Sequence, residues 1–137
     1  MDMIRFTIPY PPTKAGMAEW SKRYGLNAYW SGKTPYARSR DAREIHDLTA
    51  ACMRKAGIRR SLLDHPVEVW FFWNDGLDAD NHAAFGKMIL DAMKGYILPD
   101  DNRKWVKGVH HEFWDGREIL VEVRLYERRE AGSDSKV

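Results

Sequence analysis

The sequence predicts a small α+β (α/β-class) fold in which a mixed sheet of about four strands packs against two main helices. Short alternating or apolar runs predict strands near residues 4–8, 66–73, 105–114 and 118–127. Apolar residues at helical spacing predict helices over residues 39–56 and 80–95. A chain of 137 residues with 44% hydrophobic content can bury a modest core. We therefore expect one domain over residues 1–127 and a disordered, charged tail over residues 128–137.

The N-terminal third contains one strand, one long loop and one helix. Ile4, Phe6 and Ile8 alternate with polar residues, which is typical of a half-buried strand, and prolines end it. Residues 10–38 show no clear period and predict a long loop rich in aromatic and basic residues, with a short helix over residues 18–24. The helix over residues 39–56 should end at Gly57.

The remaining strands lie on either side of the second helix. The run PVEVWFFW at residues 66–73 is apolar on both faces after Glu68, which indicates a central strand. The segments 105–114 and 118–127 flank Asp115 and Gly116, a strong two-residue turn signal. We expect those two segments to form a hairpin, with the odd-numbered apolar residues of the second facing the core.

Carboxylates gather at both ends of the second helix. Asp78 and Asp80 precede it, and Asp100 and Asp101 follow it. Each of these residues on its own is usually a helix cap or part of a turn. Together they would repel one another without a compensating cation, and hard divalent ions bind carboxylate oxygens. The clustering therefore favours a metal site.

The same helix presents one polar face and one apolar face. If Asp80 opens the helix, Lys87 and Asp91 share a face, and Gly95 provides a C-terminal cap. The opposite, apolar stripe comprises Phe85, Met88, Ile89, Ala92 and Tyr96. The spacing does not tell whether Asp100 and Asp101 approach Asp78.

These motifs resemble the RusA-type Holliday junction resolvases (crossover junction endodeoxyribonucleases) of bacteria and phages. The shared pattern comprises an Asp-x-Asp-Asn after a strand, a helical lysine, a segment of the form LDAL-x-x-x-G and an Asp pair before the next strand. Here these are Asp78, Asp80 and Asn81, then Lys87, then LDAMKG at residues 90–95, then Asp100 and Asp101. The opening IPYPPTKAG also resembles the family's N-terminal segment, so the likeness covers nearly the whole chain. One departure is that Lys87 follows Asp80 by seven residues, two helical turns where the best-known members have one.

The resemblance implies a RusA-like fold and metal-assisted hydrolysis of phosphodiesters in four-way DNA junctions. Asp78, Asp80 and Asp101 would coordinate Mg²⁺, or Mn²⁺, with help from Asp100. Lys87 would stabilise transition-state charge or position the scissile phosphate. The resemblance further implies a homodimer whose two sites make paired nicks in DNA recombination and repair. A non-catalytic protein that binds branched DNA, or acts in assembly, remains the alternative.

Charge is divided unevenly along the chain. Residues 1–60 contain 12 Lys and Arg against 5 Asp and Glu, a net charge of +7, and residues 61–137 contain 10 against 15, a net charge of −5. A basic half suits a polyanion, because phosphate neutralisation supplies much of nucleic-acid affinity. The expected DNA contacts are Lys22, Arg23, Lys33, Arg38 and Arg40. The aromatic residues among them could stack on unpaired bases, or could instead cap the core or line a dimer interface.

Other sequence features support simpler expectations. His110 and His111 are adjacent on a predicted strand and should point to opposite faces, and His82 should lie on a helix surface. The lone Cys52 permits no internal disulfide and should belong to the core. No long apolar run or secretion signal is present, so we expect a cytoplasmic protein with no membrane partner.

Overall fold

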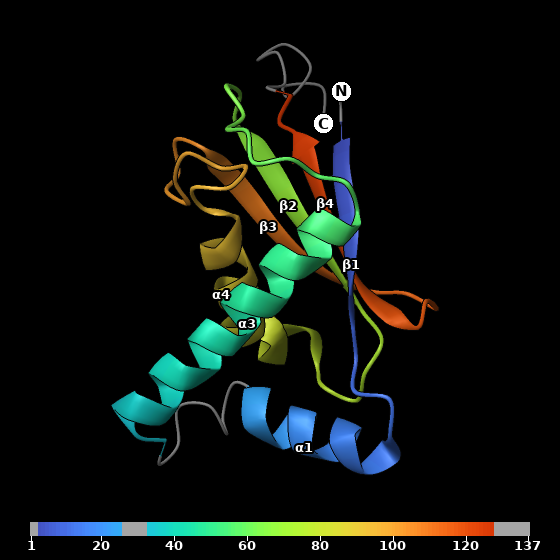
Figure 1. The fold of residues 1–137 in the computed structure, drawn as a ribbon. Helices are drawn as coiled ribbons and strands as arrows, with labels where there is room; N and C mark the ends of the chain where they lie inside the picture. The colour runs from blue at the N-terminus through green and yellow to red at the C-terminus, as the bar shows by residue number, and fades with distance from the viewer. Residues whose placement is uncertain (1–2, 26–32, 128–137) are drawn as a thin grey trace.

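The computed structural model describes residues 3–25 and 33–127 and contains a four-stranded mixed sheet in the order β1-β4-β2-β3. The strands are β1 (Met3–Pro9), β2 (Val67–Trp73), β3 (Val106–Phe113) and β4 (Glu118–Leu125). The helices are α1 (Lys14–Tyr24), α3 (Pro35–Lys55) and α4 (Ala83–Met93), preceded by a 3-10 turn, η1 (Ala79–His82). The small α+β fold with a four-stranded mixed sheet is therefore confirmed, and the described residues contain the two main helices, α3 and α4, and the shorter α1 (Figure 1).

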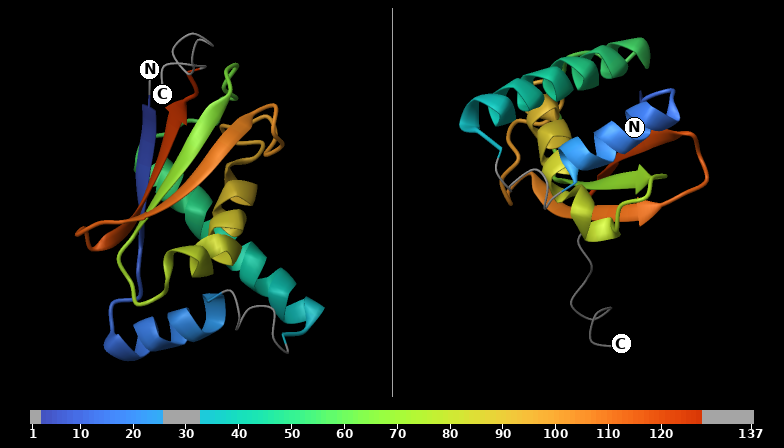
Figure 2. Two further views of the ribbon diagram at one scale, coloured as in Figure 1. Left: turned by 180° about the vertical axis from the view of Figure 1, so that it is seen from behind. Right: turned by 90° about the horizontal axis from the view of Figure 1, so that it is seen from below.

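Strand β2 lies inside the sheet, as its apolar sequence predicts. It pairs in parallel with β3 and antiparallel with β4, and α4 connects it to β3. Val67, Val69, Phe71 and Trp73 are completely buried on the face that α3 and α4 cover. The view from behind shows the opposite face of the sheet turned away from these helices (Figure 2). A rigid strand thus leads directly into the segment that carries Asp78 and Asp80.

The predicted hairpin between the last two strands is wrong. β3 and β4 are consecutive in the chain, but β2 lies between them. The connecting residues cross the end of β2, where the Trp114 N–H bonds the Trp73 carbonyl and the Asn74 side chain bonds the Gly116 carbonyl. Crossing one intervening strand takes about 10 Å, which the short connection can span. The Asp-Gly pair therefore ends a strand without forming a two-residue hairpin turn.

The stretch predicted as a loop over residues 10–38 is partly helical. The Thr13 hydroxyl accepts the Gly16 N–H and begins α1, and the Thr34 hydroxyl caps α3 one residue before Pro35. Helix α1 therefore starts four residues before the expected position, and α3 also starts four residues before Ser39. Both starts are marked by threonine caps, a signal that apolar periodicity does not contain. The tail over residues 128–137 lies outside the described residues.

Helix α4 packs tightly on the sheet and ends as predicted. Its apolar stripe is buried, and Gly95 adopts a φ of +79°, the left-handed conformation that suits a glycine after a helix. At Gly86 a Cβ atom would lie 3.1 Å from the His111 ring and 3.3 Å from the Phe71 ring. The absence of a side chain at Gly86 lets the helix approach β2 and β3 closely.

Candidate functional site

The segment that connects β2 to α4 is fixed from inside by a buried polar network. Asp75 follows the strand, and its carboxylate lies 2.7 and 2.9 Å from Nε2 of His82. The Tyr10 hydroxyl donates to Asp75 at 2.7 Å and accepts the Asn74 N–H at 2.8 Å. The side chains of Asp75 and His82 are completely buried. This network fixes both ends of the segment that carries Asp78 and Asp80.

The expectation that His82 lies on a helix surface is wrong. It ends η1 and stacks on the Trp73 ring with centroids 4.2 Å apart, so the core covers it. Asp75 went unnoticed in the sequence, although it comes two residues after a fully buried strand end and seven before a histidine. The expectation for the histidine pair on β3 is confirmed, since His110 stacks on Trp70 and His111 stacks on Phe71 on the other face.

Burial and hydrogen bonding fix the protonation of this network. Burial raises the pKa of Asp75, but the hydrogen bonds from His82 and Tyr10 outweigh it and hold that pKa below its usual value. Burial, reinforced by the bond to Asp75, raises the pKa of the Tyr10 hydroxyl. Burial and the nearby His82 lower the pKa of His111, whose Nδ1 accepts the Trp73 Nε1–H at 3.1 Å. The segment is therefore anchored by an ionised carboxylate and a protonated phenol.

Removing the Tyr10 hydroxyl should loosen this anchor. Tyr10→Phe takes a donor from the buried Asp75 carboxylate and an acceptor from the Asn74 N–H, so we expect unfolding to cost about 1–3 kcal/mol less than in the wild type. Urea unfolding followed by tryptophan fluorescence measures the change. Tyr36→Phe is the matched control, because Tyr36 is largely exposed and should change stability little. Equal stability of both variants would mean that the network does not hold the segment.

Asp78 and Asp80 lie at the protein surface, on the segment that connects β2 to α4. Asp78 occupies the N-cap position of η1, yet its side chain makes no capping hydrogen bond, and only its carbonyl accepts the Asn81 N–H. Asp80 falls in the first turn. Both residues are exposed, and none of the ion pairs among residues 3–25 and 33–127 includes either of them. The interpretation of Asp78 as a simple side-chain cap therefore finds no support.

Lys87 gathers two other carboxylates on the exposed side of α4. Its Nζ donates to Asp91 at 2.9 Å and to Asp101 at 2.7 Å. The hydrogen bond to Asp101, followed by that to Asp91, raises the pKa of Lys87, and the bond from Lys87 lowers the pKa of Asp101. The chain after α4 thus folds back to place Asp101 beside the middle of the helix.

Asp100 has a different role from its neighbour. Its carboxylate accepts the Asp101 N–H at 2.8 Å and the Asn102 side-chain amide at 3.2 Å. Lys94 lies 3.7 Å away. Both carboxylate oxygens of Asp100 thus accept hydrogen bonds within the turn. This contact pattern fits the interpretation of Asp100 as part of a turn.

The expected ligands form two groups along α4. Asp78 and Asp80 precede the helix, and Asp101 with Lys87 lies on its middle, about 10 Å further along the axis by helical rise. Across the described part of the chain, no three His, Cys, Asp or Glu side chains are close enough together to hold an ion. The donors fit Mg²⁺ in kind, since it prefers carboxylate oxygens and often takes only one or two from the protein, with water and substrate phosphate completing the shell.

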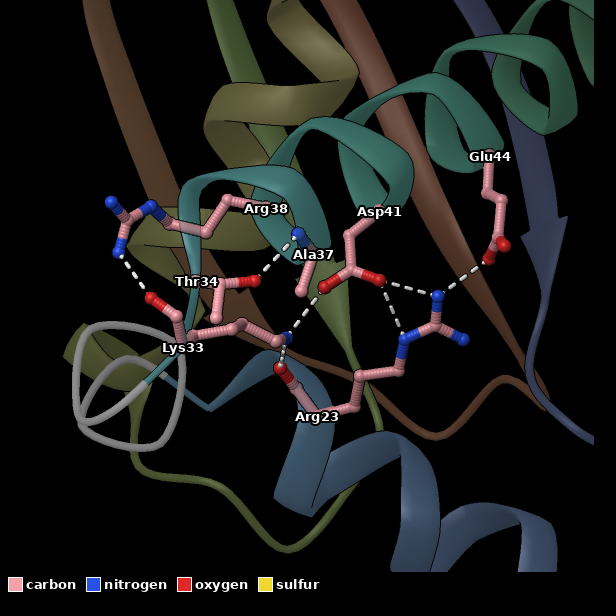
Figure 3. A network of polar contacts seen from close by, with 7 residues as sticks. All are labelled: Arg23, Lys33, Thr34, Ala37, Arg38, Asp41 and Glu44. Carbon is pink, nitrogen blue, oxygen red and sulfur yellow. Dashed lines mark hydrogen bonds and ion pairs between the residues drawn. The ribbon is translucent and has the colours of Figure 1, made fainter.

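Three of the five expected DNA-contacting cations take part in contacts within the protein (Figure 3). Arg23 bonds Asp41 and Glu44, and Lys33 bonds the other oxygen of Asp41 at 2.5 Å and the Arg23 carbonyl at 2.8 Å. Arg38 donates to the Lys33 carbonyl at 2.9 Å. Lys22 and Arg40 are exposed. The cations that join α1 to α3 thus serve the fold, and Lys22 and Arg40 lie open to a partner.

The aromatic residues of this region divide in the same way. Trp20 and Tyr24 are buried and contact Phe85 of α4, which fits the interpretation that the rings cap the core. Tyr36 is largely exposed. Tyr29 and Trp30 lie outside the described residues.

Comparison with known proteins does not identify a family for this chain. No protein-family model matches the chain, and a search of curated proteins finds no match. None of the helices in the described ranges is long and apolar enough to cross a membrane.

Proposed function

We propose that this protein is a Mg²⁺-dependent endonuclease that cuts branched DNA, with four-way junctions as its substrate. The observation that carries the proposal is the pair of exposed aspartates, Asp78 and Asp80, on a segment anchored from inside by Asp75 and His82. Exposed carboxylates on a fixed support are suited to binding a metal and a phosphate. The order of acids and lysine along the chain, which resembles the RusA family, supplies the substrate class.

Asp78 and Asp80 would hold the divalent ion. Asp101 lies about 10 Å further along the helix, so it would join them only if it leaves Lys87 and the turn after α4 moves toward η1. When bound, such an ion activates water and neutralises charge on the phosphate. Asp100 would contribute less to binding the ion, because both of its carboxylate oxygens already accept hydrogen bonds. Mn²⁺ should substitute for Mg²⁺, since both accept oxygen ligands.

Lys87 would act on the phosphate and not on the ion. Its raised pKa keeps it charged, and it is more than half exposed. A phosphate oxygen could therefore replace Asp91 or Asp101 as its partner, and the lysine would then stabilise charge that develops during hydrolysis. Exposed Lys22 and Arg40 would contact the backbone of the DNA arms.

A non-catalytic role in binding branched DNA or in assembly is the second candidate. The observation that favours it is that Lys87 pairs with both Asp101 and Asp91, which gives these acids a structural purpose. This candidate predicts junction binding without cleavage under any divalent ion.

Incubation of the pure protein with a synthetic four-way junction separates the two candidates. We expect paired nicks in Mg²⁺, none in EDTA, and little cutting of a linear duplex with the same sequence. Junction binding with no nicks in either Mg²⁺ or Mn²⁺ would favour the non-catalytic role.

Replacing Lys87 tests its assigned role. Lys87→Ala should slow cleavage by about 10²-fold, because it removes one group that stabilises transition-state charge. It should not raise the Mg²⁺ concentration needed for half-maximal rate, because Lys87 does not ligate the ion and its removal frees Asp101. Single-turnover rates across a Mg²⁺ titration measure both quantities. Lys94→Ala is the matched control, since Lys94 lies beyond α4 near Asp100 and should cut at the wild-type rate. If Lys94→Ala slowed cleavage strongly and Lys87→Ala only slightly, Lys94 and not Lys87 would be the lysine that acts on the phosphate.

A further inference from the structure

The loop after α4 and the start of β3 carry cations that mostly lack a carboxylate partner in the described part of the chain. Lys94, Arg103, Lys104 and Lys107, which we call the basic end, are all exposed. The ion pairs found within residues 3–25 and 33–127 include only one of them, Lys94, which lies 3.7 Å from Asp100. Residues 61–137, which contain the basic end, have a net charge of −5. The charge balance along the sequence therefore hides this surface.

Hydrogen bonds hold the basic end in a fixed loop. The Trp105 carbonyl accepts the Val67 N–H at 2.8 Å, which ties the loop to the start of β2. The N–H groups of Trp105 and Val106 both bond the Asn102 carbonyl, at 3.0 and 2.9 Å. The Lys104 ammonium lies 5.3 Å from the centre of the Trp105 ring, a cation–π contact. The cations are thus presented to solvent on a fixed support.

Lys107 lines a hollow at the end of the sheet. The pairing of β3 with β2 shifts register just before Glu68, which leaves Lys107 without a partner on β2. Such a bulge redirects a side chain out of the regular alternation of a strand. The hollow has a volume of about 400 Å³ and is lined by Lys107, His65, Pro66 and Tyr126. None of these four residues is acidic, and a lysine ammonium at such a wall is suited to a phosphate oxygen.

We propose that the basic end binds phosphates in a duplex arm of the junction, about six base pairs from the branch. The inference rests on the proposed function, because nicking at the segment with Asp78 and Asp80 fixes where the branch lies. That segment follows the end of β2, whereas the basic end lies beside its start (Figure 1). The seven residues of β2 separate the two by about 20 Å, and duplex DNA rises about 3.4 Å per base pair.

The path from the candidate site to the basic end follows the exposed side of α4. Lys87 lies in the middle of that helix, and Lys94 follows its last residue. Asp91 and Asp101 lie on the same side, and both bond Lys87, at 2.9 and 2.7 Å. Neither of these two acids therefore faces the path without a cation beside it.

The number and spread of the cations favour duplex DNA over a single small anion. The basic end draws its cations from residues 94–107, and the adjoining loop adds Arg60, which lies 5.4 Å from the centre of the Tyr96 ring. The Ser61 N–H bonds the Tyr96 carbonyl at 2.9 Å, which places the two loops side by side. Cations spread over this length can neutralise several phosphates, and each contact releases counterions and adds affinity.

Binding to junctions with neutral backbone patches tests the position of the contact. Methylphosphonate linkages would replace the phosphates about five to seven base pairs from the branch in every arm or, as the control, those about twelve to fourteen base pairs away. Gel-shift titration in EDTA measures affinity without cleavage. We expect the near patch to weaken wild-type binding by about 10-fold and the far patch to change it little. Equal affinity for the unmodified, near-patch and far-patch junctions would overturn the proposal.

A matched pair of variants assigns the effect to the basic end. Arg103→Gln, Lys104→Gln and Lys107→Gln together should reduce the slope of log affinity against log salt by about 2–3, and the near patch should then cause little further loss. The control removes the same charge from exposed cations of α1 and α3, through Lys14→Gln, Arg43→Gln and Lys55→Gln. It should keep the wild-type sensitivity to the near patch. A control that loses this sensitivity, or a basic-end variant that keeps it, would overturn the assignment.

These outcomes are separate from those of the cleavage assay. A junction that is bound with near-patch sensitivity but never nicked in Mg²⁺ would refute the nuclease and leave the basic end as a DNA-binding surface. A junction that is nicked, but bound equally well with and without the near patch, would do the reverse.

Discussion

Asp80→Asn should lose Mg²⁺-dependent cleavage of a four-way junction, with the rate reduced by about 10²-fold or more. The change removes a negative oxygen that the proposed ion needs, while the amide keeps nearly the same size and Asp80 makes no ion pair with the described residues that folding would lose. Junction binding should be equal or tighter, since one negative charge near the phosphates is gone. Single-turnover cleavage and gel-shift titration measure the two effects.

Two comparisons make the Asp80 result specific. Asp78→Asn should behave in the same way, because it belongs to the same exposed pair. Asp47→Asn, at an exposed position on α3, removes the same charge elsewhere and should cut at the wild-type rate. If Asp78→Asn and Asp80→Asn both nicked the junction at the wild-type rate, the segment after β2 would not contain the metal site.

Asp41→Ala should give a large loss of stability. The Asp41 carboxylate is completely buried and bonds Arg23 and Lys33 together, joining α1 to α3. Removing it leaves two partly buried cations facing one another. Breaking a buried pair costs about 3–5 kcal/mol, and the partial exposure of both cations places our expectation near 2–3 kcal/mol. Urea unfolding measures the change.

The pH dependence of this effect has a definite sign. Burial raises the pKa of Asp41, but the hydrogen bonds from Lys33 and Arg23 outweigh it and lower that pKa. A carboxyl group with a lowered folded-state pKa stabilises the protein above its unfolded-state pKa of about 3.9, and this contribution disappears as pH falls through the folded-state value. The difference between wild type and Asp41→Ala should therefore be full at pH 7 and shrink below about pH 4. Glu44→Ala, at a half-exposed partner of Arg23, should cost far less at either pH.

Sequence periodicity predicted the elements that carry the candidate site. The apolar run at residues 66–73 became the interior strand β2, and the stripe from Phe85 to Ala92 became the buried side of α4. These predictions held because burial on one or both faces directly sets which residues are apolar. Gly95 ends its helix for an equally local reason, the need for a positive φ.

Two predictions that depended on the partner of a strand or side chain were wrong, the hairpin of β3 with β4 and the exposed position of His82. The Asp115–Gly116 turn signal is local, whereas the position of β2 between β3 and β4 depends on backbone pairing with two strands that lie far from it in the sequence. Likewise, a sequence does not show that Arg23 and Lys33 converge on Asp41, or that His82 turns inward to Asp75. Charged residues far apart in the chain find their partners only once the helices pack.

We propose that Asp78 and Asp80 form a metal-dependent site for cutting junctions. The most direct measurement is single-turnover cleavage of one end-labelled four-way junction by wild type and Asp80→Asn at the same protein concentration, in Mg²⁺ and in EDTA. We expect symmetrical nicks from the wild type in Mg²⁺ alone, and intact but bound junction with Asp80→Asn. Nicking that survives EDTA, or that Asp80→Asn performs at the wild-type rate, would contradict it.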